Sequence, residues 1–256
     1  MGRAKAWLPW QGRPLVAYVV DRLREAVDEV VVVTSRELDL PRLDAQVVCD
    51  REPELGPLAG IREGLSHVRA ELAYVTATDA PFLTPEFVKT LLSFGRAAAP
   101  ELNGFIQTLA AVYPRNAAVC ATKLLDAGRR RPLDLLESQH YRRVSEVELP
   151  NLAAGRGFNT PEEYLEAVRA GGDPAPAVLE LLGRAQLAAG RREIEVPVGT
   201  LSEVLAFAPP ELGLVEDGSV ARHFLVSLDG RGFVRDGRIP VGPGEHVIVL
   251  DASVGG

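Results

Sequence analysis

Two short apolar runs of the chain each lead to an aspartate. Asp79 follows the run Ala73 to Val75, and Asp50 directly follows Val47 to Cys49. An aspartate just beyond the end of a buried strand lies where open α/β sheets bind ligands. A single carboxylate suits Mg²⁺, which prefers oxygen ligands and keeps waters that a substrate phosphate can replace. Asp79 is therefore a candidate Mg²⁺ ligand. The alternative, that it caps the turn made at Pro81, stays open on these residues alone.

Two further segments have the composition of phosphate-binding loops. Gly2 to Lys5 combines a glycine, which lets the backbone approach a ligand, with two cations that would neutralise phosphate charge. Gly56 to Gly60 opens a predicted helix, whose N-terminal amides favour negative or polar groups. The alternatives are a basic chain end without fixed structure for the first segment and a plain strand-to-helix turn for the second.

The elements that would position these residues alternate along the chain. Apolar periodicity predicts helices over residues 14–27, 61–68 after a tight loop at 56–60, 122–139 with a break at 128–131, and from Pro85 and Pro161 onwards. Short β-type runs predict strands over residues 29–34, 47–49, 73–75, 109–113 and 142–149. Alternation of this kind predicts an α/β domain with a doubly wound, mostly parallel sheet.

The composition changes near residue 170. Residues 170–176 are rich in glycine and proline and are predicted to be a linker between a first domain, 1–169, and a second domain, 177–256. Strands predicted at 192–196, 223–228 and 246–250, with a helix capped by Thr200 and Glu203, indicate a small α+β domain. The chain ends in Gly255-Gly256, which could thread a narrow channel or form a flexible tail.

Composition argues against several classes of protein. No apolar run approaches the ~20 residues that span a bilayer, and no signal peptide is visible. A net charge of −7 argues against a nucleic-acid surface. Two cysteines provide neither a disulfide framework nor a zinc cluster, so a cytoplasmic location is expected. Six arginines form a basic group near the middle of the chain: Arg115, Arg129, Arg130, Arg131, Arg142 and Arg143. The turn Arg129 to Arg131 could attract an anion or be a solvated face.

Four motifs in the same order give residues 1 to about 168 a family resemblance. They are Met1-Gly2-Arg3-Ala4-Lys5 with Leu8-Pro9, Gly56-Pro57-Leu58-Ala59-Gly60, Asp79-Ala80-Pro81 and Asn159-Thr160-Pro161-Glu162. This part of the chain resembles the molybdenum cofactor guanylyltransferases, nucleotidyltransferases with a Rossmann-like fold. The resemblance implies Mg²⁺-dependent transfer of GMP from GTP to molybdopterin or the molybdenum cofactor, with release of pyrophosphate.

The resemblance also implies a role for each matching residue. Lys5 and Asp79 would be catalytic, with Asp79 binding Mg²⁺ and Asn159 facing the pterin. The residues that would bind the nucleotide are Gly2, Arg3 and Lys5 at the phosphates, and Asp50, Gly56, Pro57, Leu58 and Gly60 at the guanine and ribose.

Residues from about 177 to 256 resemble a second family, the ubiquitin-like (β-grasp) small subunit of molybdopterin synthase, which is a sulfur carrier. The matching features are Gly199-Thr200-Leu201, the Gly244-Glu245 turn and the Gly255-Gly256 end. The resemblance implies that a partner enzyme adenylates Gly256, that this terminus becomes a thiocarboxylate, and that it delivers sulfur inside the large synthase subunit.

The sequence departs from these families at three places. It starts inside the nucleotide motif, so the first central strand and most of the glycines of that motif are not present. We therefore expect either an earlier start or a truncation. We also expect an unpaired strand position in the sheet. Gly157 stands where the transferase family has an asparagine, and residues 251–254 lack the prolines that are usual in the carrier.

Three alternative functions remain open. The first is cytidylyl transfer to the same cofactor. The second is a carrier whose N-terminal domain is inactive because its first strand and glycine loop are missing. The third is a sugar-phosphate nucleotidyltransferase, which the carrier-like end argues against. The sequence does not indicate whether the linker is cleaved.

Overall fold

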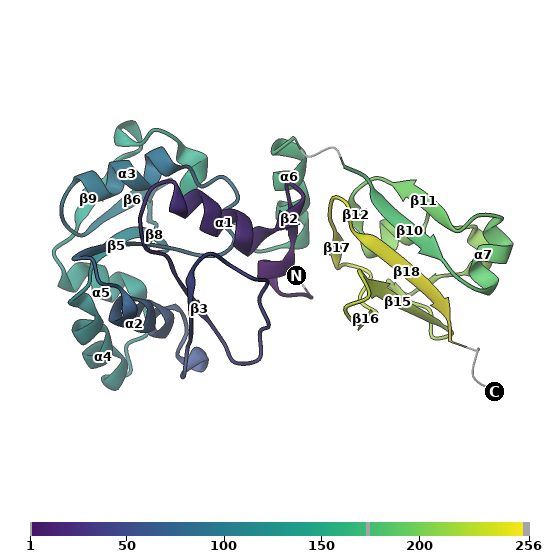
Figure 1. Cartoon of the computed structure of the whole chain (residues 1–256), viewed down its shortest axis with the longest axis horizontal. Coiled ribbons are helices and arrows are strands. Elements are labelled where there is room, and N and C mark those ends of the chain that lie inside the picture. Colours follow the sequence, from purple (N-terminus) through teal and green to yellow (C-terminus); the bar gives the residue numbers. More distant parts are fainter. Residues whose placement is uncertain (1, 173–174, 253–256) are drawn as a thin grey trace. The chain divides into compact units, whose positions relative to one another are not determined.

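The computed structural model describes residues 2–172 and 175–252 (Figure 1). The chain divides into two compact units, Val16–Gly157 on the one hand and Met1–Leu15 with Phe158–Gly256 on the other. The predicted division into 1–169 and 177–256 stays a prediction, because compactness alone does not define where a domain folds independently. Within the described residues, no helix is long and apolar enough to cross a bilayer.

The unit Val16–Gly157 contains two sheets. In the smaller, β3 (Val31–Thr34) pairs in parallel with β4 (Gln46–Cys49). In the larger, β5 (Leu72–Thr76) is antiparallel to β8 (Ala110–Pro114), and β8 is antiparallel to β6 (Ala98–Leu102). Strand β6 also pairs with β7 (Phe105–Ile106) and, in parallel, with β9 (Arg142–Val144). The larger sheet is mixed and mainly antiparallel, whereas the sequence predicted a mostly parallel sheet.

A hairpin accounts for this difference. Leu102 and Phe105 are paired across a two-residue turn made by Asn103 and Gly104, both with positive φ (51° and 80°). These dihedrals belong to the turn type that matches the twist of antiparallel strands, for which Asn-Gly is the favoured pair. The hairpin reverses the chain after β6, so that β8 runs back between β6 and β5.

Helices cover both faces of the larger sheet (Figure 1). They are α1 (Leu15–Arg24), α2 (Pro57–His67), α3 (Pro85–Ser93), α4 (Ala117–Asp126) and α5 (Pro132–Ser138). Residues of α2, α4 and α5 share a core with β8, in which Leu58, Tyr113 and Leu135 are fully buried. The predicted break at 128–131 is confirmed, and Pro132 starts α5 after it.

Short 3₁₀ turns complete this unit: η2 (Pro53–Leu55), η3 (Glu146–Glu148) and η4 (Leu152–Gly155). The strand predicted over 142–149 therefore ends at Val144. The cause is a capping box, in which the Ser145 side chain accepts from the Glu148 backbone and the Glu148 carboxylate accepts from the Ser145 backbone.

Strands β3 and β5 each have one strand partner within the described residues. Every residue of both strands is only half-buried, although both strands are mainly apolar, whereas β6 and β8 are almost completely buried. One edge of β3 and one edge of β5 thus lack a strand partner in the described part of the chain.

The second unit contains the N-terminal segment and the helix α6 (Pro161–Ala170). The segment consists of η1 (Lys5–Trp7) and a hairpin of β1 (Pro9–Trp10) and β2 (Arg13–Pro14). The start of α6 is as predicted: Thr160 is the N-cap, Pro161 is the first helical residue, and Glu163 completes the capping box.

The rest of this unit is built on a five-stranded mixed sheet in the order β11-β10-β18-β15-β16. These strands are β10 (Ala177–Leu181), β11 (Glu193–Val196), β15 (Phe224–Leu228), β16 (Phe233–Val234) and β18 (His246–Asp251). Strands β10 and β18 are parallel and the other pairs are antiparallel.

Two short helices accompany this sheet, α7 (Arg184–Ala189) and α8 (Leu201–Leu205). The remaining elements are β12 (Gly199–Thr200), η5 (Pro210–Leu212), β13 (Val215–Glu216), β14 (Ser219–Val220) and β17 (Pro240–Val241). Leu201 and Val204 of α8 share one core with Leu179, Val226 and Val247 of the sheet. The capping box predicted for Thr200 and Glu203 is present.

Candidate functional site

Lys5 and Asn159 lie together although 154 residues separate them in the chain. The Lys5 ammonium donates to the Phe158 carbonyl at 2.6 Å and to the Asn159 side-chain oxygen at 3.1 Å. Its Nζ also lies 5.8 Å from the centroid of the Phe158 ring. The structure thus joins the cation expected at the nucleotide phosphates to the amide expected at the pterin.

The start of α6 fixes Asn159. The Asn159 backbone N–H donates to the Glu163 carboxylate at 2.6 Å, and the Glu163 N–H donates to the Thr160 hydroxyl. Phe158 is buried, and its ring packs on Tyr164 with 5.3 Å between centroids. Local capping and one aromatic contact therefore place both oxygens that hold Lys5.

Arg3 has partners from the end of the chain. Its Nη1 lies 2.6 Å from the Glu245 carboxylate and 3.4 Å from the Pro240 carbonyl. The other Glu245 oxygen accepts from the Gly242 N–H at 2.8 Å. Burial raises the pKa of the Glu245 carboxyl, while Arg3 and the Gly242 N–H act in the opposite direction. The expected phosphate role of Arg3 stays a prediction, and it would require this guanidinium to exchange partners.

Asp79 lies in the turn that follows β5, in the unit Val16–Gly157. Gly157 packs directly against it. A Cβ atom at residue 157 would lie 2.7 Å from the Asp79 carbonyl oxygen and 3.0 Å from its carboxylate oxygen Oδ1. The close approach accounts physically for a glycine at residue 157, where the resemblance to the transferases leads us to expect an asparagine.

Asp50 follows β4 and is buried, with a carboxylate oxygen accepting from the Glu52 N–H at 2.9 Å. The Cα of Gly60 faces this carboxylate, because a Cβ there would lie 3.9 Å from its other oxygen. Two of the residues expected at the nucleotide are thus neighbours.

A tight loop was predicted at 56–60, but most of this segment is helical. Gly56 is the N-cap of α2, with a φ of 80° that favours glycine, and Pro57 to Gly60 form its first turn. The side chain of Leu58 is fully buried in the core, so only the backbone of this residue is placed to contact a ligand. The turn still offers the amides of a helix N-terminus.

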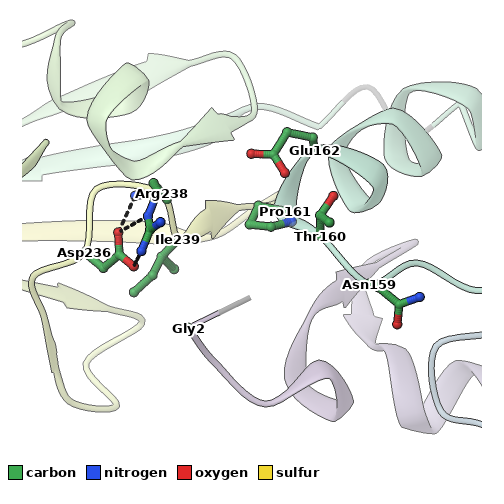
Figure 2. Close-up of a pocket in the computed structure, with 8 residues that line it drawn as sticks. All are labelled: Gly2, Asn159, Thr160, Pro161, Glu162, Asp236, Arg238 and Ile239. Carbon is green, nitrogen blue, oxygen red and sulfur yellow. Dashed lines mark hydrogen bonds and ion pairs between the residues drawn. The ribbon is translucent and has the colours of Figure 1, made fainter.

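A cavity of about 330 Å³ lies in the second unit (Figure 2). It is lined by Gly2, Asn159, Thr160, Pro161, Glu162, Asp236, Arg238 and Ile239. Gly2 has a φ of 65°, and a Cβ there would lie 2.8 Å from the Ile239 side chain. A glycine is therefore needed at this wall of the cavity.

Residues 1–144 match the family described as the MobA-like NTP transferase domain, which is more than half of the chain. The chain belongs to this family. A probable molybdenum cofactor guanylyltransferase of Natronomonas pharaonis is 34% identical over 169 residues, which cover 61% of this chain and 84% of that protein. The molybdenum cofactor guanylyltransferase of Pseudomonas entomophila is 32% identical over 167 residues, covering 59% and 87%.

Solved structures show the same fold. Molybdopterin-guanine dinucleotide biosynthesis protein A from Archaeoglobus fulgidus superposes with a TM-score of 0.57 at 24% identity, covering 66% of this chain and 91% of that one. A 2-C-methyl-D-erythritol 4-phosphate cytidylyltransferase from Thermus thermophilus superposes with a TM-score of 0.53 at 17% identity, covering 64% and 91%. The α/β nucleotidyltransferase fold predicted for the N-terminal part is confirmed.

Within this MobA-like domain, part of the basic group identified in the sequence is neutralised locally. Arg129 pairs with Asp134 at 3.0 Å. Arg142 pairs with Glu148 and stacks on the Phe94 ring, 3.9 Å from its centroid. These contacts support the interpretation of the arginines as a solvated face.

Sequence reasoning missed three residues of the cavity beside Asn159. Asp236, Arg238 and Ile239 come from the loop before β17, and the only signal for them is a pair of opposite charges two residues apart around a glycine.

Among the described residues, no three His, Cys, Asp or Glu side chains are grouped so that they could bind a metal ion together.

Proposed function

We propose that the MobA-like part of the chain transfers GMP from GTP to molybdopterin or the molybdenum cofactor, and that it works in the cytoplasm. The observation that carries the proposal is the contact of Lys5 with Asn159, which places a cation beside the amide expected at the second substrate. The guanylyltransferases that resemble the chain at 34% and 32% identity support the choice of reaction.

The reaction needs positioning and neutralisation of charge. An oxygen of the molybdopterin phosphate would attack the α-phosphorus of GTP, a new P–O bond would form, and the bond to the β-phosphate would break with release of pyrophosphate. Lys5 is held in place by two oxygens before any substrate binds, so its charge stabilises the developing negative charge with little reorganisation. Asp50 and the first turn of α2 would hold the base and ribose.

Asp79 would hold Mg²⁺. Its single carboxylate fits this ion, because Mg²⁺ is commonly bound through one or two carboxylates and the substrate phosphates. The ion, when bound, would neutralise phosphate charge.

A test of this function measures pyrophosphate release and the nucleotide product with molybdopterin, Mg²⁺ and either GTP or CTP. We expect product from GTP, and we expect Lys5→Ala and Asp79→Asn each to lower the rate by about 10²- to 10³-fold. Matched controls are Lys89→Ala on α3 and Asp126→Asn on α4, both exposed. Turnover of CTP in preference to GTP would make the protein a cytidylyltransferase. Turnover of neither would overturn the proposal and favour an inactive N-terminal domain.

We further propose that residues 177–256 carry sulfur as a β-grasp domain. Support comes from the mixed sheet with a parallel β10–β18 pair and from α8, which shares its core. Gly255 and Gly256, the proposed attachment point, lie outside the described residues. The proposed partners are an enzyme that adenylates Gly256 and the large subunit of molybdopterin synthase.

Mass spectrometry of the protein from its native host tests the carrier function. We expect a species in which sulfur replaces one oxygen of the terminal carboxylate, and its loss in a variant that lacks Gly256. Finding only the free carboxylate in cells that make the cofactor would contradict the proposal. The same spectrum would show whether the linker is cleaved, as two smaller masses.

A further inference from the structure

The cavity beside Asn159 has walls from three distant parts of the chain. One is Gly2, one is the start of α6, and the third is the loop 236–239 (Figure 2). Its volume of about 330 Å³ is near the lower end of the range for small-molecule sites. A cavity of this size suits one ring system of a ligand rather than a whole dinucleotide.

Contacts outside the cavity hold its walls together. The buried pair of Arg3 and Glu245 ties the segment that carries Gly2 to the residues before β18. Tyr164 of α6 is fully buried and donates to the Pro9 carbonyl at 2.7 Å. A Cβ at Gly242 would collide with the Tyr164 hydroxyl, so the turn before β18 and α6 are closely packed. The backbone walls of the cavity are therefore fixed before a ligand binds, whereas the side chains of Glu162 and Arg238 are exposed.

The acidic side chains of the cavity are ionised at neutral pH. Hydrogen bonds from Arg238 lower the pKa of the Asp236 carboxyl. The Glu162 pKa is lowered first by its own backbone N–H and then by the Thr160 side chain. The lining thus offers carboxylate acceptors and guanidinium donors, which suits a polar ligand that both donates and accepts hydrogen bonds.

Arg238 is already oriented by Asp236. Its Nε and Nη2 donate to the two carboxylate oxygens at 3.1 and 3.0 Å. A guanidinium has five N–H groups, so others remain for a ligand. Figure 2 shows the Glu162 side chain extending from the start of α6 towards the loop that carries Arg238. The loop 236–239 therefore presents guanidinium donors, the start of α6 presents the Glu162 carboxylate, and Pro161 and Ile239 add apolar atoms to the lining.

We propose that this cavity recognises the 2-amino-4-oxopyrimidine edge that guanine and pterins share. The Glu162 carboxylate would accept from the 2-amino group and the adjacent ring N–H, and Arg238 would donate to the ring oxygen. A carboxylate accepts two parallel N–H groups well, and arginine donates well to the oxygen and neighbouring nitrogen of guanine. Cytosine lacks the paired N–H edge. The inference deepens the proposed function, because it gives the C-terminal part of the chain a role in choosing the substrate.

Calorimetric titration with four probes tests the proposal. Neopterin and GTP carry the edge, whereas the 2-oxo counterpart of neopterin and ITP lack the 2-amino group. Either neopterin or GTP occupies the cavity. Glu162→Gln and Arg238→Gln should each weaken the binding of that ligand by about ten- to hundredfold, because each substitution removes a hydrogen bond to a charged group. Glu162→Gln should have a much smaller effect on the probe that lacks the 2-amino group, which is the 2-oxo counterpart for neopterin and ITP for GTP. Glu166→Gln, one turn along α6 and exposed, is the control.

The outcomes separate the two sources of this edge. A loss confined to neopterin assigns the cavity to the pterin. A loss confined to GTP assigns it to guanine and would overturn the proposed role of Asp50 and the first turn of α2 at the base. Unchanged affinities for both in Glu162→Gln and Arg238→Gln would overturn the inference while leaving guanylyl transfer intact if turnover persists. A wild-type protein that neither binds these probes nor turns over GTP would overturn the proposed function as well.

Discussion

Lys5, Asp79 and Gly157 show how single residues depend on their immediate neighbours. Lys5 is fixed by two oxygens from the residues before α6, so its charge is in place before substrate arrives. Asp79 is enclosed on one side by the backbone of Gly157. The proposed function therefore depends at this scale on small neighbours as much as on the charged groups.

Gly157→Asn tests this dependence. The new Cβ would lie 2.7 Å from the Asp79 carbonyl oxygen, so the turn that carries Asp79 must move. We expect a loss of about 1–3 kcal/mol in the free energy of unfolding, as for overpacked sites, and a fall in GTP turnover. Arg156→Ala changes the exposed neighbour and should leave both unchanged. Wild-type turnover in Gly157→Asn would show that Asp79 does not need this close contact.

The stability at acidic pH should depend on Glu148. Its pKa is lowered first by the Ser145 backbone N–H, then by the Ser145 hydroxyl and Arg142. The unfolded carboxyl, with a pKa near 4.5, binds a proton more readily than the folded one, so ionised Glu148 stabilises the fold above that pH. The contribution is lost as the pH falls through the lower folded pKa.

Thermal unfolding measured from about pH 6 down to pH 3 would detect this pH-dependent contribution of Glu148 to stability. We expect Tm of Glu148→Gln to be lower than wild type at the higher pH and to approach it at the lower. Glu137→Gln, on the exposed side of α5, should follow the wild-type curve. A difference in Tm between wild type and Glu148→Gln that stays constant over this pH range would show that ionisation of Glu148 does not contribute to stability.

Among the elements, those with strong local signals were predictable from the sequence. The starts of α3, α6 and α8 follow from a threonine cap, and from proline at the first helical position in α3 and α6. Strand β3 follows from its β-branched run, and it is parallel to β4 as such a run indicates, although it is only half-buried. The antiparallel course of β8 was not predicted, although Asn103-Gly104 is a strong hairpin signal, because the flanking strands are short and β7 has only two residues.

Thr160→Ala tests the importance of the α6 cap. The hydroxyl accepts from the Glu163 N–H, and its removal leaves a donor of the first turn without that partner. We expect a loss of about 0.5–2 kcal/mol in the free energy of unfolding, measured by urea denaturation. Because Asn159 precedes the cap, GTP turnover should fall as well.

The control for this variant is Thr122→Ala. Thr122 is exposed within α4, and its hydroxyl donates to the Ala118 carbonyl inside the helix. Alanine has the higher helix propensity, so this change should be neutral or slightly stabilising. Equal effects of the two substitutions would argue against a special role for the cap.

At the scale of the whole molecule, the two ends of the chain belong to one compact unit. Arg3 contacts the Pro240 carbonyl across 237 residues of sequence. Local periodicity and capping signals act over a few residues, so a role for Arg3 followed from the sequence only through the family resemblance, and Glu245 was not expected as its partner. The cavity residues Asp236 and Arg238 were missed for the same reason.

Arg3→Ala should therefore destabilise the protein more than its position near the chain end suggests. It would leave the buried Glu245 carboxylate without its guanidinium, and loss of one partner of a buried pair costs about 3 kcal/mol or more. Urea unfolding would measure the loss. Arg235→Ala, which alters an exposed arginine of the same unit, should change the stability by less than about 0.5 kcal/mol. If both variants were equally stable, the pair would contribute little.

Calorimetric titration with nucleotides is the decisive measurement for the proposed Mg²⁺-dependent guanylyl transfer. GTP and CTP are titrated into the protein with and without Mg²⁺, and into Asp79→Ala with Mg²⁺. We expect binding of GTP that requires Mg²⁺, is much weaker in Asp79→Ala and is not matched by CTP. Absence of binding by either nucleotide, or GTP binding that is indifferent to Mg²⁺ and to Asp79, would contradict this proposal.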